Sequence, residues 1–135
     1  MGSIVVGYVP KPEGHAALKR AAEEAKLRDM RLVVVNSHRG GREWDRDETA
    51  DSEGQLEEEV RSALQDSGVE HEVRQLVRGL DPADDLVNVA TEVDAEIIVI
   101  GLRRRTPVGK LILGSNAQRV LLDAPCPVLA VKATE

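Results

Sequence analysis

The fold is decided by an apolar run, a glycine-flanked loop and a helix start, which follow one another in the stretch Ala95-Glu-Ile-Ile-Val-Ile-Gly-Leu-Arg-Arg-Arg-Thr-Pro-Val-Gly-Lys-Leu-Ile-Leu-Gly-Ser-Asn116. The run Ile97–Ile100 is apolar at every position, which is typical of a strand buried on both faces of a sheet. The segment Ser115–Asp123 has the composition of a helix, and Ser115 with Gln118 fits a capping box that would open it. We therefore predict a central strand, a loop and a helix, in that order.

The loop is locally basic in an acidic chain. The formal net charge of the chain is −6, whereas the segment from Gly101 to Arg119 has no acidic residue. Its five basic residues are Arg103, Arg104, Arg105, Lys110 and Arg119. A helix N-terminus offers N–H groups without intrahelical partners and the positive end of a dipole. A basic loop that leads into such a terminus predicts a site for an anionic ligand.

Strands and helices alternate along the rest of the chain. Apolar runs predict further strands at Ser3–Tyr8, Arg31–Asn36, Val69–Val77 and Val128–Val131. Helix-forming residues predict helices at Glu13–Arg28, at Ser52–Asp66 and after the N-cap Asp81. With right-handed crossovers, this alternation predicts one α/β domain over residues 1–135: a doubly wound, five-stranded parallel sheet with helices on both faces.

Composition excludes several classes of protein. An acidic chain with a pI near 5.1 lacks the basic face that nucleic-acid binding requires. No apolar stretch approaches the roughly 20 residues of a membrane span, and no signal peptide is visible, so we expect a cytoplasmic protein. His15, His38 and His71 show no ligand spacing, so we expect no metal site. Cys126 is the only cysteine, and we expect a buried, unreactive thiol.

The chain resembles the universal stress protein family, the UspA-like domain of adenine nucleotide alpha hydrolase-like type, over nearly its whole length. In the first predicted strand the resemblance rests on Val5-Val6-Gly7. In the last one it rests on the closing run Ala124-Pro-Cys-Pro-Val-Leu-Ala-Val131. Its most specific part is the spacing of Gly101, Gly114 and Ser115, which matches the family's nucleotide-binding motif Gly-x2-Gly-x9-Gly-Ser/Thr.

The resemblance implies a sheet of order 3-2-1-4-5, a homodimer that is often formed through the last strand, and ATP or another adenine nucleotide as a potential ligand. It places the base and ribose near the ends of strands one and two, and the phosphates in the glycine loop. The residues that would bind phosphate are Gly101, Arg103, Arg104, Gly114, Ser115 and Asn116. Those that would line the base and ribose end are Tyr8, Val9 and Ser37.

Two positions depart from the family pattern. Arg104 stands where the motif has its second glycine, and Val9 stands where the family has the aspartate that serves the ribose. No catalytic constellation is apparent, so we predict binding without turnover. Three functions remain open: a regulatory module that binds a nucleotide or phosphate, a homodimeric protein-interaction module of the stress response that no longer binds ATP, and an ATPase.

Overall fold

The computed structural model describes residues 2–38, 56–77, 81–102 and 114–133. Five parallel strands form one sheet in the order β3-β2-β1-β4-β5, as predicted. The strands are β1 (Ser3–Gly7), β2 (Arg31–His38), β3 (His71–Val77), β4 (Ala95–Leu102) and β5 (Val128–Lys132). The helices are α1 (Pro12–Arg28), a helix over residues 56–64, α3 (Pro82–Glu92) and α4 (Ser115–Asp123).

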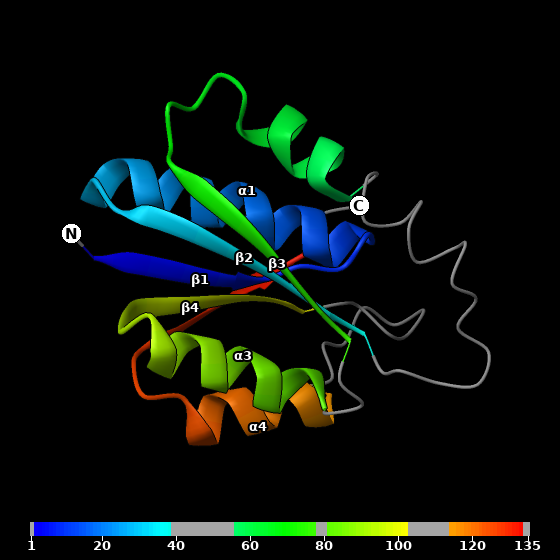
Figure 1. Ribbon diagram of the computed structural model, residues 1–135. Helices are drawn as coiled ribbons and strands as arrows, with labels where there is room; N and C mark the ends of the chain where they lie inside the picture. Colours follow the sequence, from blue (N-terminus) through cyan, green and yellow to red (C-terminus); the bar gives the residue numbers. More distant parts are fainter. Residues whose placement is uncertain (1, 39–55, 78–80, 103–113, 134–135) are drawn as a thin grey trace.

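The helices cover both faces of the sheet. α1 and the helix over 56–64 lie on one face, and α3 and α4 lie together on the other (Figure 1). This is the arrangement that right-handed crossovers produce when the chain first moves outward from β1 to β3 and then crosses to β4. The predicted doubly wound architecture is therefore confirmed. No helix within the described ranges is long and apolar enough to cross a membrane.

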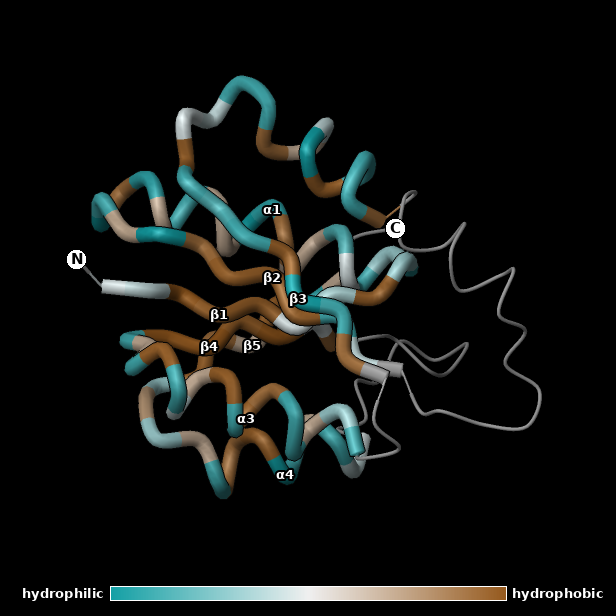
Figure 2. Tube along the Cα trace, in the orientation of Figure 1, coloured by the Kyte–Doolittle hydropathy of each residue, from teal (hydrophilic) through white to brown (hydrophobic). Residues whose placement is uncertain are grey.

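The core consists of two aliphatic layers, because successive side chains of a strand point to opposite faces. In β1, Ile4 and Val6 pack beneath α1, whereas Val5 packs beneath α3. The inner strands β1, β2 and β4 form the hydrophobic centre of the molecule in Figure 2, whereas the edge strand β3 and the outer faces of the helices are largely hydrophilic. In β4, Ile98 and Val99 are fully buried, as expected for the central strand of the predicted stretch.

Several element ends differ from the predicted bounds by one or two residues, and two differences bear on the candidate site. β2 continues through Ser37 and His38 instead of ending at Asn36, because these two residues pair with Leu76 and Val77 of β3. The N-cap of α4 is Gly114 and not Ser115, so the predicted capping box is wrong. Ser115 is the first residue of the helix, and the N-cap residue makes no side-chain capping bond.

The strand order creates one position at which connections diverge. From β1 the chain moves to β2 on one side, whereas β4 lies on the other side of β1. The carboxyl ends of β1 and β4 are therefore not covered by a single crossover connection. In open α/β sheets, ligands bind in the crevice at such a topological switch point.

Candidate functional site

A cavity of about 220 Å³ lies at this switch point. Its floor is formed by the ends of β1, β2 and β4, and its walls come from the first turns of α1, α3 and α4. Its described lining residues are Gly7, Tyr8, Val9, Glu13, Gly14, Val35, Ser37, Pro82, Ala83, Leu86, Ile100, Gly101, Asn116, Ala117 and Val120. The lining is mainly aliphatic with a few polar groups, which is the usual composition of a small-molecule site.

The structure brings five of the predicted site residues together around this cavity. Val9 and Gly101 lie at the ends of β1 and β4, Ser37 lies in β2, and Asn116 lies in the first turn of α4. The fifth, Tyr8, contributes through its main chain. Gly114 and Ser115 lie at the start of α4, beside the cavity-lining Asn116 and Ala117. Arg103 and Arg104, with the loop over 103–113, lie outside the described residues.

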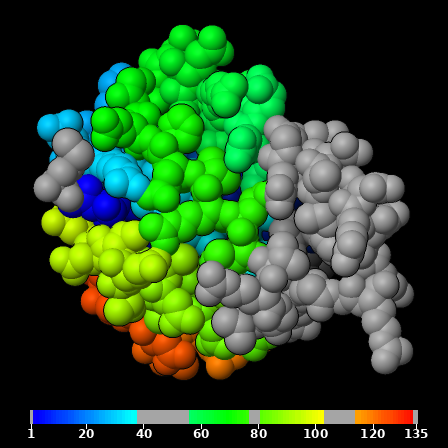
Figure 3. Space-filling view, viewed as in Figure 1, coloured from blue at the N-terminus to red at the C-terminus, as the bar shows by residue number. Residues whose placement is uncertain are grey.

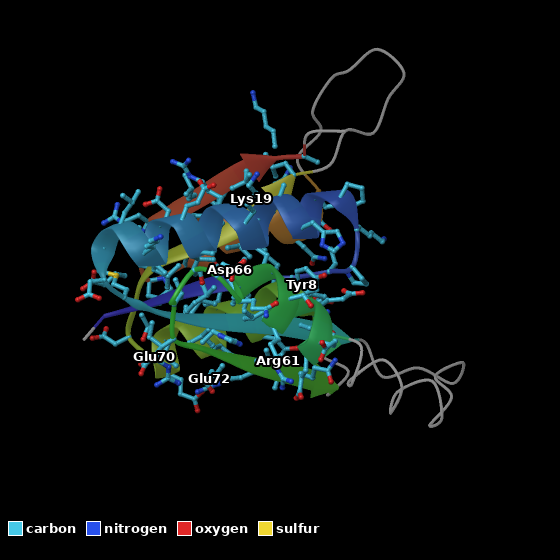
Figure 4. All side chains as sticks on the ribbon, turned by 90° about the horizontal axis from the view of Figure 1, so that it is seen from above. Tyr8, Lys19, Arg61, Asp66, Glu70 and Glu72 are labelled. Carbon is cyan, nitrogen blue, oxygen red and sulfur yellow. The ribbon has the colours of Figure 1, made fainter. Side chains whose placement is uncertain are left out.

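The ring of Tyr8 points away from the cavity, to the face covered by α1. It belongs to the core beneath that helix and is 1% exposed. Figure 4 shows Tyr8 beside α1 and the helix over 56–64. Its hydroxyl donates to Glu59 Oε2 at 2.8 Å and lies 3.3 Å from His15 Nδ1. Burial raises the pKa of the Tyr8 hydroxyl, and the bond to the Glu59 carboxylate raises it further. The Tyr8 side chain therefore joins β1 to two helices and does not line the cavity.

The two motif glycines have different surroundings. A Cβ at Gly101 would lie 2.1 Å from the carbonyl oxygen of Glu13, so the absence of a side chain lets α1 approach the end of β4. A Cβ at Gly114 would meet no atom of the described residues within 4 Å. Gly101 is thus required by packing inside the protein, whereas the described residues leave the space beside Gly114 open, at a helix terminus whose N-cap residue makes no side-chain bond.

Arg119 contributes less free positive charge than the sequence indicated. Its guanidinium lies 2.7 Å from Asp81 Oδ2 and 3.2 Å from Asp84 Oδ1, both at the start of α3. This pair of contacts joins the first turns of α3 and α4, which form one wall of the cavity. Arg119 therefore holds two elements together, and much of its charge is balanced by the two aspartates.

Sequence reasoning missed Glu13 and the close contact at Gly14. Glu13 is the one acidic side chain among the described cavity-lining residues. A Cβ at Gly14 would lie 1.8 Å from the carbonyl oxygen of Val9, so this glycine lets α1 start directly against the end of β1. One feature of the sequence could have indicated this contact: an acidic residue and a glycine follow Pro12 directly, in the first turn of the predicted helix.

Cys126 is only partly buried, less than the sequence predicted. Pro127 lies beside it, and the carbonyl oxygen of Pro127 accepts from the N–H of Ile98, which anchors the start of β5 to β4. Burial raises the pKa of the Cys126 thiol, and a hydrogen bond with the Ile98 backbone opposes this shift. A raised thiol pKa disfavours the nucleophilic thiolate.

Comparisons with known proteins agree on one family. The sequence profile of the universal stress protein family matches residues 1–132. A universal stress protein of Mycolicibacterium smegmatis (strain ATCC 700084 / mc(2)155) is 49% identical over 129 residues, which cover 96% of each chain. A solved universal stress protein from Archaeoglobus fulgidus has a TM-score of 0.84 and 41% identity, and the match covers 98% of this chain and 99% of that one.

A second solved structure was determined with a ligand. It is the universal stress protein from Archaeoglobus fulgidus in complex with dAMP, at a TM-score of 0.78 and 36% identity, with 98% of each chain covered. The family profile, the identity to relatives over nearly the full length and the shared sheet order point to the same conclusion. The chain belongs to the universal stress protein family.

Proposed function

We propose that this chain is a regulatory module that binds an adenine nucleotide in the cavity at the switch point, with the phosphate at the N-terminus of α4. The observation that carries this proposal is the continuity between an apolar cavity and an uncapped helix terminus. An apolar cavity suits a base, and the helix terminus suits a phosphate. The dAMP complex of a protein 36% identical to this one supports the same class of ligand.

Gly114 supports the phosphate end of this proposal. The described residues leave the space beside it open, so a ligand oxygen can approach the backbone N–H groups of the first turn. Ser115 and Asn116 add polar side chains at the same point. Arg103 and Arg104, which lie outside the described residues, remain predicted phosphate ligands. ATP remains a predicted ligand alongside the monophosphate.

Glu13 is our proposed partner for the ribose. The aspartate that the family has at position 9 is replaced by Val9, which is 40% exposed and offers no acceptor. Glu13 lines the same cavity and lies in the first turn of α1, close to the end of β1. A carboxylate accepts hydrogen bonds from both hydroxyls of a ribose. Glu13 thus provides the carboxylate acceptor that the side chain of Val9 lacks.

Thermal shift with AMP, ATP, cyclic AMP and inorganic phosphate tests the proposed function. A ligand at 100 times its Kd stabilises the folded state by about 2.7 kcal/mol, which is a readily measured rise in Tm. Gly114→Val should abolish the rise while the chain still folds, because no described atom lies within 4 Å of the new Cβ. Leu122→Ala is the matched control, since Leu122 lies on the same helix, is 84% exposed and does not line the cavity.

Two results would contradict the proposal. The first is an unchanged Tm with every nucleotide and with phosphate at millimolar concentration. The second is steady release of phosphate from ATP that disappears in Gly114→Val, since we propose binding without turnover. A cytoplasmic location also remains our prediction.

The alternative function is that of a protein-interaction module, and the observation that favours it is Val9. An exposed valine replaces the acidic group at the mouth of the cavity, which makes this rim suited to contact with another protein surface. The same thermal-shift series separates the two functions, because an interaction module that no longer binds nucleotide gives no response to any of the four ligands.

We also propose that the chain forms a homodimer through β5. β5 lies at the edge of the sheet, with β4 as its one neighbour among the described strands. An unpaired edge is a template for a second strand, and a two-fold axis would pair two copies of β5 antiparallel. Its residues Val128, Leu129 and Val131 are half-buried in the single chain.

A further inference from the structure

We propose that Ser37, oriented by Asp85, acts as a hydrogen-bond acceptor that makes the cavity select a purine with an amino group at position 6 over one with a carbonyl. The inference rests on the proposed function, because it assigns the specificity of the same cavity. Its basis is a contact between a residue of β2 and a residue of α3, which no sequence pattern predicted.

Ser37 and Asp85 form a hydrogen bond behind the cavity wall. The hydroxyl of Ser37 donates to Asp85 Oδ2. Ser37 lines the cavity, whereas Asp85 lies behind it, in the groove between β3 and α3, and is 2% exposed. β3 and α3 meet along the front of the molecule, where the green and yellow-green atoms adjoin in Figure 3. Asp85 therefore acts on a ligand only through Ser37.

The side chain of Ser37 points to the face that holds the cavity. Val33 and Val35 of the same strand pack beneath α3, and alternation places the Ser37 side chain on that face as well. The bond to Asp85, a residue of α3, agrees with this placement. The Ser37 oxygen therefore lies at the β2 end of a cavity that is also walled by Pro82, Ala83 and Leu86 of α3.

The Asp85 contact fixes what Ser37 can offer to a ligand. A hydroxyl has one proton and two lone pairs, whereas a carboxylate only accepts. Because the proton is directed at Asp85, the lone pairs of Ser37 are left for the cavity. A hydrogen bond to a carboxylate is about twice as strong as one between neutral groups, so a ligand carbonyl does not readily draw the proton away. Ser37 is thus complementary to an N–H donor and repels a carbonyl oxygen.

The position of Ser37 suits the base end of a nucleotide. β2 and β4 are separated by β1, and a strand spacing of about 4.8 Å places Ser37 roughly 10 Å from the β4 side of the cavity. Gly101 and the start of α4, where we propose that the phosphate binds, lie on that side. A nucleoside monophosphate can therefore reach the α4 terminus with its phosphate and Ser37 with its base.

AMP and IMP are the probes that test this inference, because IMP has a carbonyl at position 6 and a proton on N1, where AMP has an amino group and an unprotonated N1. Isothermal titration calorimetry on the wild-type protein should give a Kd for IMP about tenfold above that for AMP, the ratio expected when one hydrogen bond is lost. Ser37→Ala should bring the two Kd values to within about twofold, by weakening AMP. Ser37→Thr keeps the hydroxyl and should keep the preference for AMP.

The substitution Asp85→Asn tests the role of Asp85 more directly than the Ser37 variants do. The asparagine amide can donate to the Ser37 oxygen, which frees the Ser37 proton to point into the cavity. The preference should then shift toward IMP, an effect that a merely structural role of Asp85 would not produce. Glu92→Gln is the matched control: it removes the same charge from the same helix and groove, does not contact Ser37, and should keep the AMP preference. If Asp85→Asn fails to fold, the comparison of Ser37→Ala with Ser37→Thr tests whether the Ser37 hydroxyl sets the preference for AMP.

The outcomes separate this inference from the function on which it rests. Equal Kd values for AMP and IMP in the wild type, or an unchanged ratio in both Ser37→Ala and Asp85→Asn, would overturn the role of Ser37 and leave nucleotide binding intact. Absence of binding by either nucleotide would overturn the proposed function and the inference with it.

Discussion

The hydroxyl of Tyr8 joins three elements at one end of the sheet. It is bonded to Glu59, lies beside His15 and leaves the tyrosine ring in an edge-on contact with the imidazole, at 5.6 Å between ring centroids. The main chain of the same residue is held from the other side, since Asn36 Nδ2 donates to the Tyr8 carbonyl at 2.8 Å. Tyr8 therefore fixes the end of β1 that forms the cavity floor.

Tyr8 should ionise only well above the pH at which a free tyrosine does. Burial and the Glu59 carboxylate raise its pKa above the ordinary value of 10.0. Because the folded state holds this proton more tightly, the stabilisation is full below pH 10 and is lost as the pH rises from there through the folded pKa. Tyr8 is the only tyrosine, so tyrosinate absorbance reports on it directly.

Two measurements check this prediction. Tyrosinate absorbance should appear at higher pH in the folded protein than in urea. Between pH 8 and pH 11, the free energy of unfolding should fall more steeply for the wild type than for Tyr8→Phe. A tyrosine that titrates at the same pH in the folded and unfolded chain would contradict the buried contact.

Gly101→Ala should destabilise the fold. The new Cβ would lie 2.1 Å from the Glu13 carbonyl oxygen, so α1 must move away from β4. Overpacking of this kind costs about 1–3 kcal/mol of unfolding free energy, which urea denaturation measures. Gly114→Ser is the matched control and should change stability by less than about 0.5 kcal/mol, because serine and glycine are both favoured at an N-cap. Equal losses in the two variants would argue against the different roles of these glycines.

At the scale of elements, α3 and α4 are joined across their first turns by Arg119. The side chains of Arg119, Asp81 and Asp84 are 49%, 37% and 38% exposed, so water and salt screen their interaction. Asp81 stands at the N-cap of α3, as predicted, yet no side-chain capping bond forms there. One of its oxygens instead pairs with Arg119.

Arg119→Ala should therefore have a small and salt-dependent effect. Exposed ion pairs contribute about 0.2–1 kcal/mol, so the loss of unfolding free energy should lie in this range at low salt. The difference from the wild type should shrink in 1 M salt, where the screening length is about 3 Å. Urea denaturation at two salt concentrations measures both values. A loss that is independent of salt would assign the role of Arg119 to packing of its aliphatic stem.

The elements were predictable where a local pattern determines them. Ile97–Ile100 is apolar throughout and lies in β4, an inner strand between β1 and β5, and the strand order followed from the family resemblance. The end of β2 was not predictable, because Ser37 and His38 are polar and extend the strand only through pairing with β3. The cap of α4 was missed because the extended backbone of Gly114 takes the N-cap position without offering a side chain.

The candidate site was predictable in its location more than in its residues. The position of a basic loop between a strand and a helix indicated where a ligand would bind. The cavity also depends on Glu13 and Leu86, which come from helices distant in the sequence, and on Asp85 behind Ser37. Such contacts arise from the packing of α1 and α3 against the sheet, and no local pattern records them.

At the scale of the whole molecule, the edge strand β5 determines how two copies would meet. Pro127 accepts from Ile98, and Ala133 donates to Leu102, so every second residue of β5 is bonded to β4. By this alternation, the N–H of Ala130 points outward, away from β4. An outward N–H can bond a second copy, whereas its loss leaves the β4 ladder intact.

Ala130→Pro should therefore dissociate the proposed dimer without unfolding the chain. Analytical ultracentrifugation should give a dimer for the wild type and for Ala130→Ser, which keeps the N–H, and a monomer for Ala130→Pro. Circular dichroism should show the same secondary structure in all three proteins. A wild-type monomer, or a dimer that tolerates the proline, would rule out pairing through this strand.

The contrast between Gly101 and Gly114 has a consequence for how the sequence can change in evolution. Gly101 is required by contacts within the protein, whereas the described residues leave the space at Gly114 open for the ligand that we propose. A lineage that gave up its ligand would be free to replace Gly114 while still needing Gly101. The first motif glycine is thus a marker of the fold, and the last one is the better marker of a ligand. Loss of the ligand would therefore be visible in a sequence as a replacement at position 114, and not as a replacement at position 101.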